Sequence, residues 1–263
     1  MAKNNNLGDF LKGLADKFRS KLGTADTINP QNFEDKIDAV YEAAAQKAYN
    51  DFWDGFQQNG KRTNYEYAFA RWNYTGTGDP KYKITLDSNS TDVMMFCRNA
   101  QITKITADKY DFSQALCEDA GYNVSGHYNT FFGCSNLEKI EDAGLKSGYY
   151  YETFRDCAKL HTIAILRFNK ATLITTACFK GCTTLKNISF EGTVGKSISF
   201  LDSPLTADSV KSLLDHLDTA EYGGTRTVTV KTASKTAYDE KYGDWDTRIA
   251  QLTSSGNWTF TLS

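Results

Sequence analysis

The sequence has few histidines and no long hydrophobic run. Only three of the 263 residues are His, so few imidazole side chains are present for catalysis or metal binding. No stretch approaches the ~18–20 uninterrupted apolar residues of a membrane-spanning helix. Asp9, Lys12, Asp16 and Lys17 interrupt any apolar core of an N-terminal signal peptide. We therefore expect no membrane span and no export by the usual signal-peptide route.

Net charge is nearly absent as well. Lys and Arg number 30 against 32 Asp and Glu, a formal charge of -2, so the chain has no broad basic field and we expect no nucleic-acid partner. A hydrophobic content of 40% excludes a disordered protein. Six Cys are too sparse for a disulfide scaffold. They could equally be small apolar side chains buried in the core, and their spacing along the sequence distinguishes these roles.

Residues 1–60 contain two amphipathic segments. Apolar residues between Leu7 and Leu22 follow helical spacing, and Gly23 is a plausible C-cap. Asn29-Pro30 has the residues of a helix start, an N-cap followed by proline at the first helical position. From there an apolar stripe continues to Gly60. We predict a helical assembly or attachment segment over residues 1–60.

The second stripe is longer than the first helix can cover. It therefore predicts a homo-oligomer formed through these helices, or docking on another protein. The alternatives are that the stripe folds back onto the rest of the chain, or lies on a membrane surface. The residues assigned to oligomerisation are Phe33, Ile37, Val40, Ala44, Phe52 and Phe56. Residues 61–80 form an aromatic linker, more typical of a structural plug than of a ligand cage.

The strongest signal is an internal repeat. Three segments share the pattern Phe-x-x-Cys-x-x-Leu-x-x-Ile without gaps, and a fourth has Asn in place of Cys and Ile in place of Leu. We call this pattern the repeat register. Its members are Phe96, Asn99, Ile102 and Ile105; Phe131, Cys134, Leu137 and Ile140; Phe154, Cys157, Leu160 and Ile163; and Phe179, Cys182, Leu185 and Ile188.

Such a repeat predicts an α/β repeat solenoid over residues 81–200, in which each repeat supplies a short strand and a returning turn or helix. Leu and Ile should point inward, Phe should fill the layer behind them, and Cys should lie buried at a turn. Cys134, Cys157 and Cys182 should then stack as a column of thiols. Residues 106–130, which include Cys117, depart from the register and are either a divergent repeat or a protruding loop.

The cysteines do not resemble a metal or catalytic site. Cys178 and Cys182 have no second pair at ligand spacing, and His127, His161 and His216 are scattered. The chain also shows no Ser-His-Asp, Cys-His or phosphate-loop signature. We expect a protein without metal or cofactor that is not an enzyme.

Residues 201–263 have the pattern of an α/β C-terminal cap that closes the last repeat. A truncated strand at Ile198–Phe200 precedes a helix with Thr206 as N-cap. An alternating strand follows at Thr227–Val230. A single last helix is expected over residues 236–252, before Trp258–Leu262.

Candidate binding residues flank the inward Ile of each strand and should face outward. They are small, polar and of mixed charge, which suits a glycan or a polar protein surface: Lys104, Thr106, Lys139, Glu141, Thr162, Ala164, Asn187 and Ser189. Tyr150 is added from the run Tyr149–Tyr151, because three adjacent tyrosines cannot all point inward and an exposed ring can stack on sugars or proteins.

The register resembles the BspA-type leucine-rich repeats of bacterial surface proteins and of phage and prophage tail proteins. Residues 18–30 are similar to an I-R-x-K-T-G-x-x-x-x-I-x-P segment of tail and baseplate-associated proteins from phages of Gram-positive bacteria. Residues 52–60, 62–65 and 257–259 also look like that group. Asn and Cys interchange at the Cys position of such repeats.

The resemblance implies a non-enzymatic phage tail or baseplate protein, made in the bacterial cytoplasm and carried in the virion. Its partners would be other virion proteins and a host cell-surface glycan or protein. The alternative is a bacterial cell-surface adhesin of the same repeat family, which would need an export signal and an anchor.

Overall fold

A computed structural model describes residues 7–22, 36–40, 43–44, 47, 84–85, 95–112, 129–145, 149–168, 172–220 and 224–263. Helices and parallel sheets make up its regular structure. The chain divides into two compact units, residues 1–60 and 61–263. The predicted aromatic linker, residues 61–80, lies outside the described residues.

The first unit contains the helix α1, Leu7–Leu22, over the range that the apolar spacing predicts. Ala15 and Phe18 are buried on it, and Leu14 and Val40 pack against them. Residues 36–40, which include Val40, are helical too. Part of the second apolar stripe therefore packs against α1 within this unit.

Other members of that stripe remain at the surface of the chain. Ile37 leaves 54% of its surface exposed, and Ala44 is exposed as well. Ile37 is therefore available to a partner, whereas Val40 is partly used within the unit. Three further residues assigned to oligomerisation lie outside the described residues: Phe33, Phe52 and Phe56.

The second unit is built around a parallel sheet in which the repeats lie side by side. Its strands are β2 (Lys104–Ile105), β4 (Lys139–Ile140), β6 (Thr162–Phe168) and β8 (Asn187–Gly192), in the order β2-β4-β6-β8. The register pairs the fourth position of every repeat with that of the next, Ile105 with Ile140, then Ile163, then Ile188. All four Ile side chains are buried.

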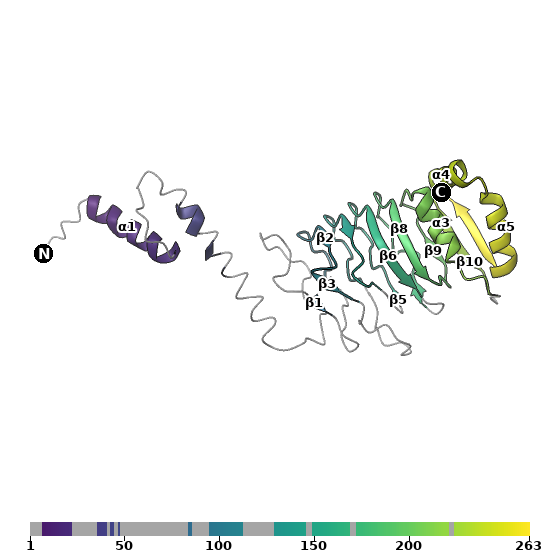
Figure 1. Ribbon diagram of the computed structural model, residues 1–263, viewed down its shortest axis with the longest axis horizontal. Coiled ribbons are helices and arrows are strands. Elements are labelled where there is room, and N and C mark those ends of the chain that lie inside the picture. Colours follow the sequence, from purple (N-terminus) through teal and green to yellow (C-terminus); the bar gives the residue numbers. More distant parts are fainter. Residues whose placement is uncertain are drawn as a thin grey trace. The chain divides into compact units, whose positions relative to one another are not determined.

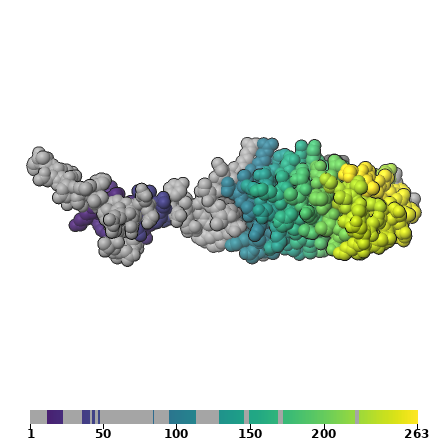
Figure 2. Space-filling view, turned by 90° about the horizontal axis from the view of Figure 1, so that it is seen from above, coloured from purple at the N-terminus to yellow at the C-terminus, as the bar shows by residue number. Residues whose placement is uncertain are grey.

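Short strands also lie in the returning segments, as far as the structure describes these segments. β1 (Ile84–Thr85) pairs with β3 (Tyr110–Asp111), and β5 (Tyr149–Tyr150) pairs with β7 (Leu173–Ile174), both in parallel. Within this unit the colours run from teal to yellow in chain order (Figures 1 and 2), so successive repeats stack on one another. We call each stacked repeat a rung.

The phenylalanines of the register form one stack through the rungs. Phe96, Phe131, Phe154 and Phe179 are almost completely buried. Successive ring centroids lie 5.4, 5.7 and 5.4 Å apart with interplanar angles of 6°, 5° and 9°. Phe200 adds a fifth ring, 4.6 Å from Phe179 and tilted by 26°. The predicted layer of Phe behind the strands is confirmed.

The cysteines of the register form the predicted column of thiols. Each Sγ donates a hydrogen bond to the main-chain carbonyl of the Phe one rung earlier: Cys134 to Phe96 at 3.0 Å, Cys157 to Phe131 at 3.0 Å and Cys182 to Phe154 at 2.9 Å. The Cys position is therefore occupied by a small buried donor that satisfies a carbonyl inside the stack.

Two polar residues occupy the Cys position at the ends of this column. Asn99 accepts hydrogen bonds from the main-chain N–H groups of Gln101 and Ile102 at 2.8 and 3.0 Å. Ser203 donates to the main-chain carbonyl of Cys182 at 3.1 Å. The main-chain N–H of Ser203 donates a hydrogen bond to the carbonyl of Phe200. In the same way, the N–H of each register Cys donates to the carbonyl of the Phe three residues earlier. Phe200 and Ser203 thus form a fifth turn that the strict pattern does not reveal.

In the four turns of the repeat register, the third position has a left-handed backbone. Arg98, Gly133, Asp156 and Gly181 have φ of 56°, 69°, 61° and 77°. Gly133 and Gly181 adopt this region without a steric penalty, whereas Arg98 and Asp156 adopt it because the turn imposes it. These four turns therefore share a left-handed third residue although its identity varies.

We predict that the buried thiols are unreactive in the folded chain. Burial raises the pKa of Cys134, Cys157, Cys178 and Cys182, that of Cys178 to about 12, so the reactive thiolate is scarce even at about pH 8. Treatment of the native chain with N-ethylmaleimide and peptide mapping should find these four unmodified. The same chain in guanidinium chloride should label fully. Native labelling of Cys157 at the denatured rate would contradict the buried column.

The C-terminal cap covers the open edge of the sheet. In helix α3 (Ala207–Asp215), the Ser209 and Ser212 hydroxyls accept hydrogen bonds from the N–H groups of Ile188 and Phe190 in β8, at 2.9 and 3.0 Å. These bonds replace the strand that would otherwise come next. Thr206 caps α3 by accepting from the N–H of Ser209, as predicted.

A second parallel sheet lies within the cap. β9 (Ile198–Ser199), β10 (Arg226–Val230) and β11 (Trp258–Leu262) pair in the order β11-β10-β9. Alternate residues of β10 are buried, which confirms the alternation seen in the sequence.

The prediction of a single last helix is wrong. The chain forms α4 (Thr232–Tyr242) and α5 (Trp245–Gly256), separated at Gly243, whose φ of 70° ends α4. Tyr238 and Trp245 pack across this break with ring centroids 5.6 Å apart. Tyr238 of α4 and Trp245 of α5 are buried against each other. The apolar spacing in the sequence therefore continues across the break between the two helices.

Candidate functional site

The sheet presents one row of polar side chains on its outer face. The pairing places Lys104 beside Lys139, Lys139 beside Thr162, and Thr162 beside Asn187. We call these four residues the outer row. Lys104 and Asn187 are exposed, and Lys139 and Thr162 are half-buried. Since the next residue of every strand is a buried Ile, the outer row is held at fixed spacing by the core beneath it.

A second group of predicted residues lies just beyond this row. Glu141 pairs with Lys139 of the same segment, with Oε1 and Nζ 3.1 Å apart. Its main-chain N–H bonds the carbonyl of Ile105. Thr106 is half-buried one position after Ile105. Ala164 and Ser189 are not buried either, so none of the predicted strand-flanking residues is part of the core.

An ion-pair chain crosses the same face near the ends of β6 and β8. Both terminal nitrogens of Arg167 donate to the Asp142 carboxylate at 2.6 and 2.9 Å, and its Nε lies 3.2 Å from Glu191. The hydrogen bond to Asp142 raises the pKa of Arg167, and the same bond lowers the pKa of Asp142. This geometry fixes three charges in place on neighbouring rungs.

This chain of charges could not be found from the sequence alone. Arg167 and Glu191 are cross-strand partners only because β6 is irregular between Ile163 and Leu166, where two residues stand opposite one in β8. Without that bulge the register would place different residues opposite each other. The sequence carries no signal for the position of the bulge.

The choice of Tyr150 as a surface residue is wrong. Its side chain is fully buried, and its hydroxyl donates to the main-chain carbonyl of Arg167 at 2.9 Å. In a strand successive side chains point to opposite faces, so the neighbour Tyr149 points outward instead. Tyr149 and Tyr151 are half-buried with ring centroids 5.7 Å apart. Burial and then Tyr151 raise the pKa of Tyr149.

No family model, curated protein or solved structure matches this chain. None of the helices in the described part is long and apolar enough to cross a bilayer.

The chemistry that the outer face offers is hydrogen bonding and charge pairing. Within the described ranges, no group of three or more His, Cys, Asp or Glu side chains is placed to hold a metal ion. The Nδ1 of His161 lies 2.9 Å from the Thr162 hydroxyl, and that of His216 lies 2.7 Å from the carbonyl of Ser212. The outer face thus presents hydroxyl, amide and charged side chains over buried Ile residues.

Proposed function

We propose that this protein is a leucine-rich-repeat solenoid whose outer face recognises a host cell surface or another virion protein, without catalysis. The observation that carries the proposal is the outer row of Lys104, Lys139, Thr162 and Asn187 in parallel register. These side chains combine donors, acceptors and positive charge over a core of buried Ile. A rigid polar surface loses little conformational entropy on binding, which favours recognition.

The proposed setting is a phage tail or baseplate. The resemblance of residues 18–30 to a segment of tail and baseplate-associated proteins supports this setting. The helical segment of residues 1–60 would attach the protein to the particle and join copies into a homo-oligomer. The exposure of Ile37 supports such a contact. A bacterial cell-surface adhesin of the same repeat family is the second candidate, favoured by the same outer face.

We predict that charge reversal on the outer face abolishes recognition. In the double variant Lys104→Glu/Asn187→Glu, two exposed residues at opposite ends of the outer row become acidic. Binding of the labelled full chain to a panel of Gram-positive cells and to purified phage tails is then measured. Native protein should bind one of the two, and the variant at least about tenfold more weakly, since mismatched charge at an interface is costly.

A matched control separates this effect from overall charge. Lys159→Glu/Thr183→Glu changes the formal charge by the same amount, at exposed positions between the Cys and Leu of two repeats. It should bind like the native chain, and both variants should keep the native melting temperature. Absence of native binding to cells and to tails, or equal binding by both variants, would overturn the proposed function.

A further inference from the structure

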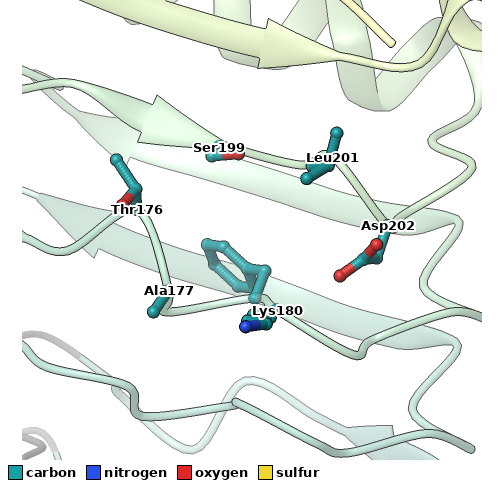
Figure 3. Close-up of a pocket in the computed structure, with 7 residues that line it drawn as sticks. Thr176, Ala177, Lys180, Ser199, Leu201 and Asp202 are labelled. Atoms are coloured by element: carbon teal, nitrogen blue, oxygen red, sulfur yellow. The ribbon is translucent and has the colours of Figure 1, made fainter.

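A pocket of about 310 Å³ lies where the fourth Phe turn meets the fifth. Thr176 and Ala177 line one side of it, and Ser199, Leu201 and Asp202 line the neighbouring segment, with Lys180 below them (Figure 3). The pocket lies on the turns and shares no residue with the outer row.

The pocket exists because side chains become small at this rung. Thr176 and Ala177 precede Phe179 by three and two residues, as Tyr151 and Glu152 precede Phe154. Replacing a tyrosine and a glutamate by threonine and alanine removes the groups that would fill this space. The change of the ring stack from near-parallel to a 26° tilt between Phe179 and Phe200 occurs at the same place.

One polar group of the pocket is held firmly in position. The Asp202 carboxylate accepts the N–H of Gly181 through Oδ2 at 2.8 Å. In the three earlier rungs the equivalent N–H groups, those of Arg98, Gly133 and Asp156, donate instead to main-chain carbonyls at 2.6, 2.8 and 2.7 Å. At the pocket, the Asp202 side chain thus takes the place of the main-chain carbonyl as acceptor. Its carboxylate is already held in position in the folded chain, so ligand binding does not have to order it.

The remaining lining combines hydroxyl, ammonium and apolar groups. Thr176 and Ser199 supply hydroxyls, and Lys180 supplies an exposed ammonium. Phe179, Ala177 and Leu201 supply apolar surface, and Leu201 is 51% exposed. One Lys and one Asp cancel in charge, so the pocket offers no net attraction to a phosphate or a sulfate.

We infer that this pocket binds a single pyranose residue of a surface glycan. Vicinal sugar hydroxyls both donate and accept, which matches a carboxylate, an ammonium and two hydroxyls, while the C–H face of the ring matches Leu201 and Ala177. The volume lies at the small end of ligand sites, about 300–1,000 Å³, and suits one ring. This inference adds a second binding site, on the turns, to the recognition proposed for the outer face, and it rests on that proposed function for its biological role.

The test uses the full chain and named monosaccharides. Saturation-transfer NMR is run with glucose, galactose, N-acetylglucosamine, N-acetylgalactosamine and rhamnose, and with D- and L-alanine as zwitterionic probes. At least one sugar should bind, with a dissociation constant on the order of 1–10 mM, since so small a ligand makes few contacts. Binding of no sugar, or of alanine alone, would overturn the inference.

A filled-pocket variant locates the binding. Thr176→Tyr/Ala177→Glu introduces the side chains that the preceding rung already carries, and the new carboxylate lies three residues before Lys180, as Glu152 lies before its ion-pair partner Arg155. This variant should fold and lose sugar affinity at least tenfold. Asp202→Asn keeps an acceptor for Gly181 and should weaken binding several-fold. Sugar affinity within twofold of native in the filled variant would place the site elsewhere.

The outcomes separate this inference from the proposed function. If the native chain binds cells or tails and the filled variant binds them equally without any sugar signal, the pocket inference fails and recognition by the outer face stands. If the native chain binds neither cells nor tails but binds a sugar in the pocket, the recognition function fails while the ligand site stands.

Discussion

Replacing Phe154 by alanine is expected to lower the free energy of unfolding by about 3–5 kcal/mol, the range for emptying a buried aromatic site. The ring is fully buried and stacks on Phe131 at 5.7 Å and on Phe179 at 5.4 Å. Its neighbours are themselves held in the stack, so they cannot move to fill the space. Urea unfolding of the full chain, monitored by far-UV circular dichroism, measures the loss.

The adjacent turn offers a matched control for this variant. Phe132→Ala removes the same number of atoms, but the ring is half-buried outside the stack. It contacts the Arg98 and Arg155 guanidiniums at 5.5 and 5.6 Å, contacts worth about 0.5–1 kcal/mol each at exposed sites. We expect a clearly smaller loss than for Phe154→Ala. A loss below about 1 kcal/mol for Phe154→Ala, or equal losses for both variants, would contradict the role of the ring stack.

The second large effect is expected in the cap, where Arg226→Met should destabilise the fold by about 3–5 kcal/mol. The Arg226 guanidinium is buried and donates to the Asp218 carboxylate at 3.0 Å and to the main-chain carbonyls of Asp218, Ala220 and Gly256. It also lies 4.6 Å from the Trp258 ring. Methionine fills a similar volume but leaves a nearly buried carboxylate without its counter-charge.

The destabilisation combines two effects: the Asp218 carboxylate loses the Arg226 guanidinium, and three main-chain carbonyls lose a donor. The double variant Arg226→Met/Asp218→Leu should therefore recover part of the stability, because both charges are then removed. Arg248→Met is the control, since its guanidinium is half-buried and pairs with the exposed Asp215 carboxylate at 3.3 Å. It should cost about 1 kcal/mol or less. Urea unfolding of all three variants tests this, and a cost for Arg226→Met no larger than for Arg248→Met would refute it.

Local packing decided the surface features that sequence reasoning missed or misplaced. Which tyrosine of the run Tyr149–Tyr151 points inward depends on the strand alternation and on the pairing of β5 with β7. The pocket depends on Thr176 and Ala177 lying against a segment more than twenty residues later. The contact between Arg167 and Glu191 depends on a bulge. None of these neighbours is close in sequence.

The amino-acid sequence by itself determined the repeat register and what it does in the core. Residues that recur at a near-constant spacing come to equivalent positions in every rung, so the Ile pairs, the Phe stack and the Cys column follow from the spacing alone. The tertiary structure alone decided the burial of Arg226 and the side-chain neighbours on the turns, whereas the break at Gly243 has a local signal in the glycine itself. That burial and those neighbours depend on contacts between segments whose separation is not periodic, and no local pattern encodes them.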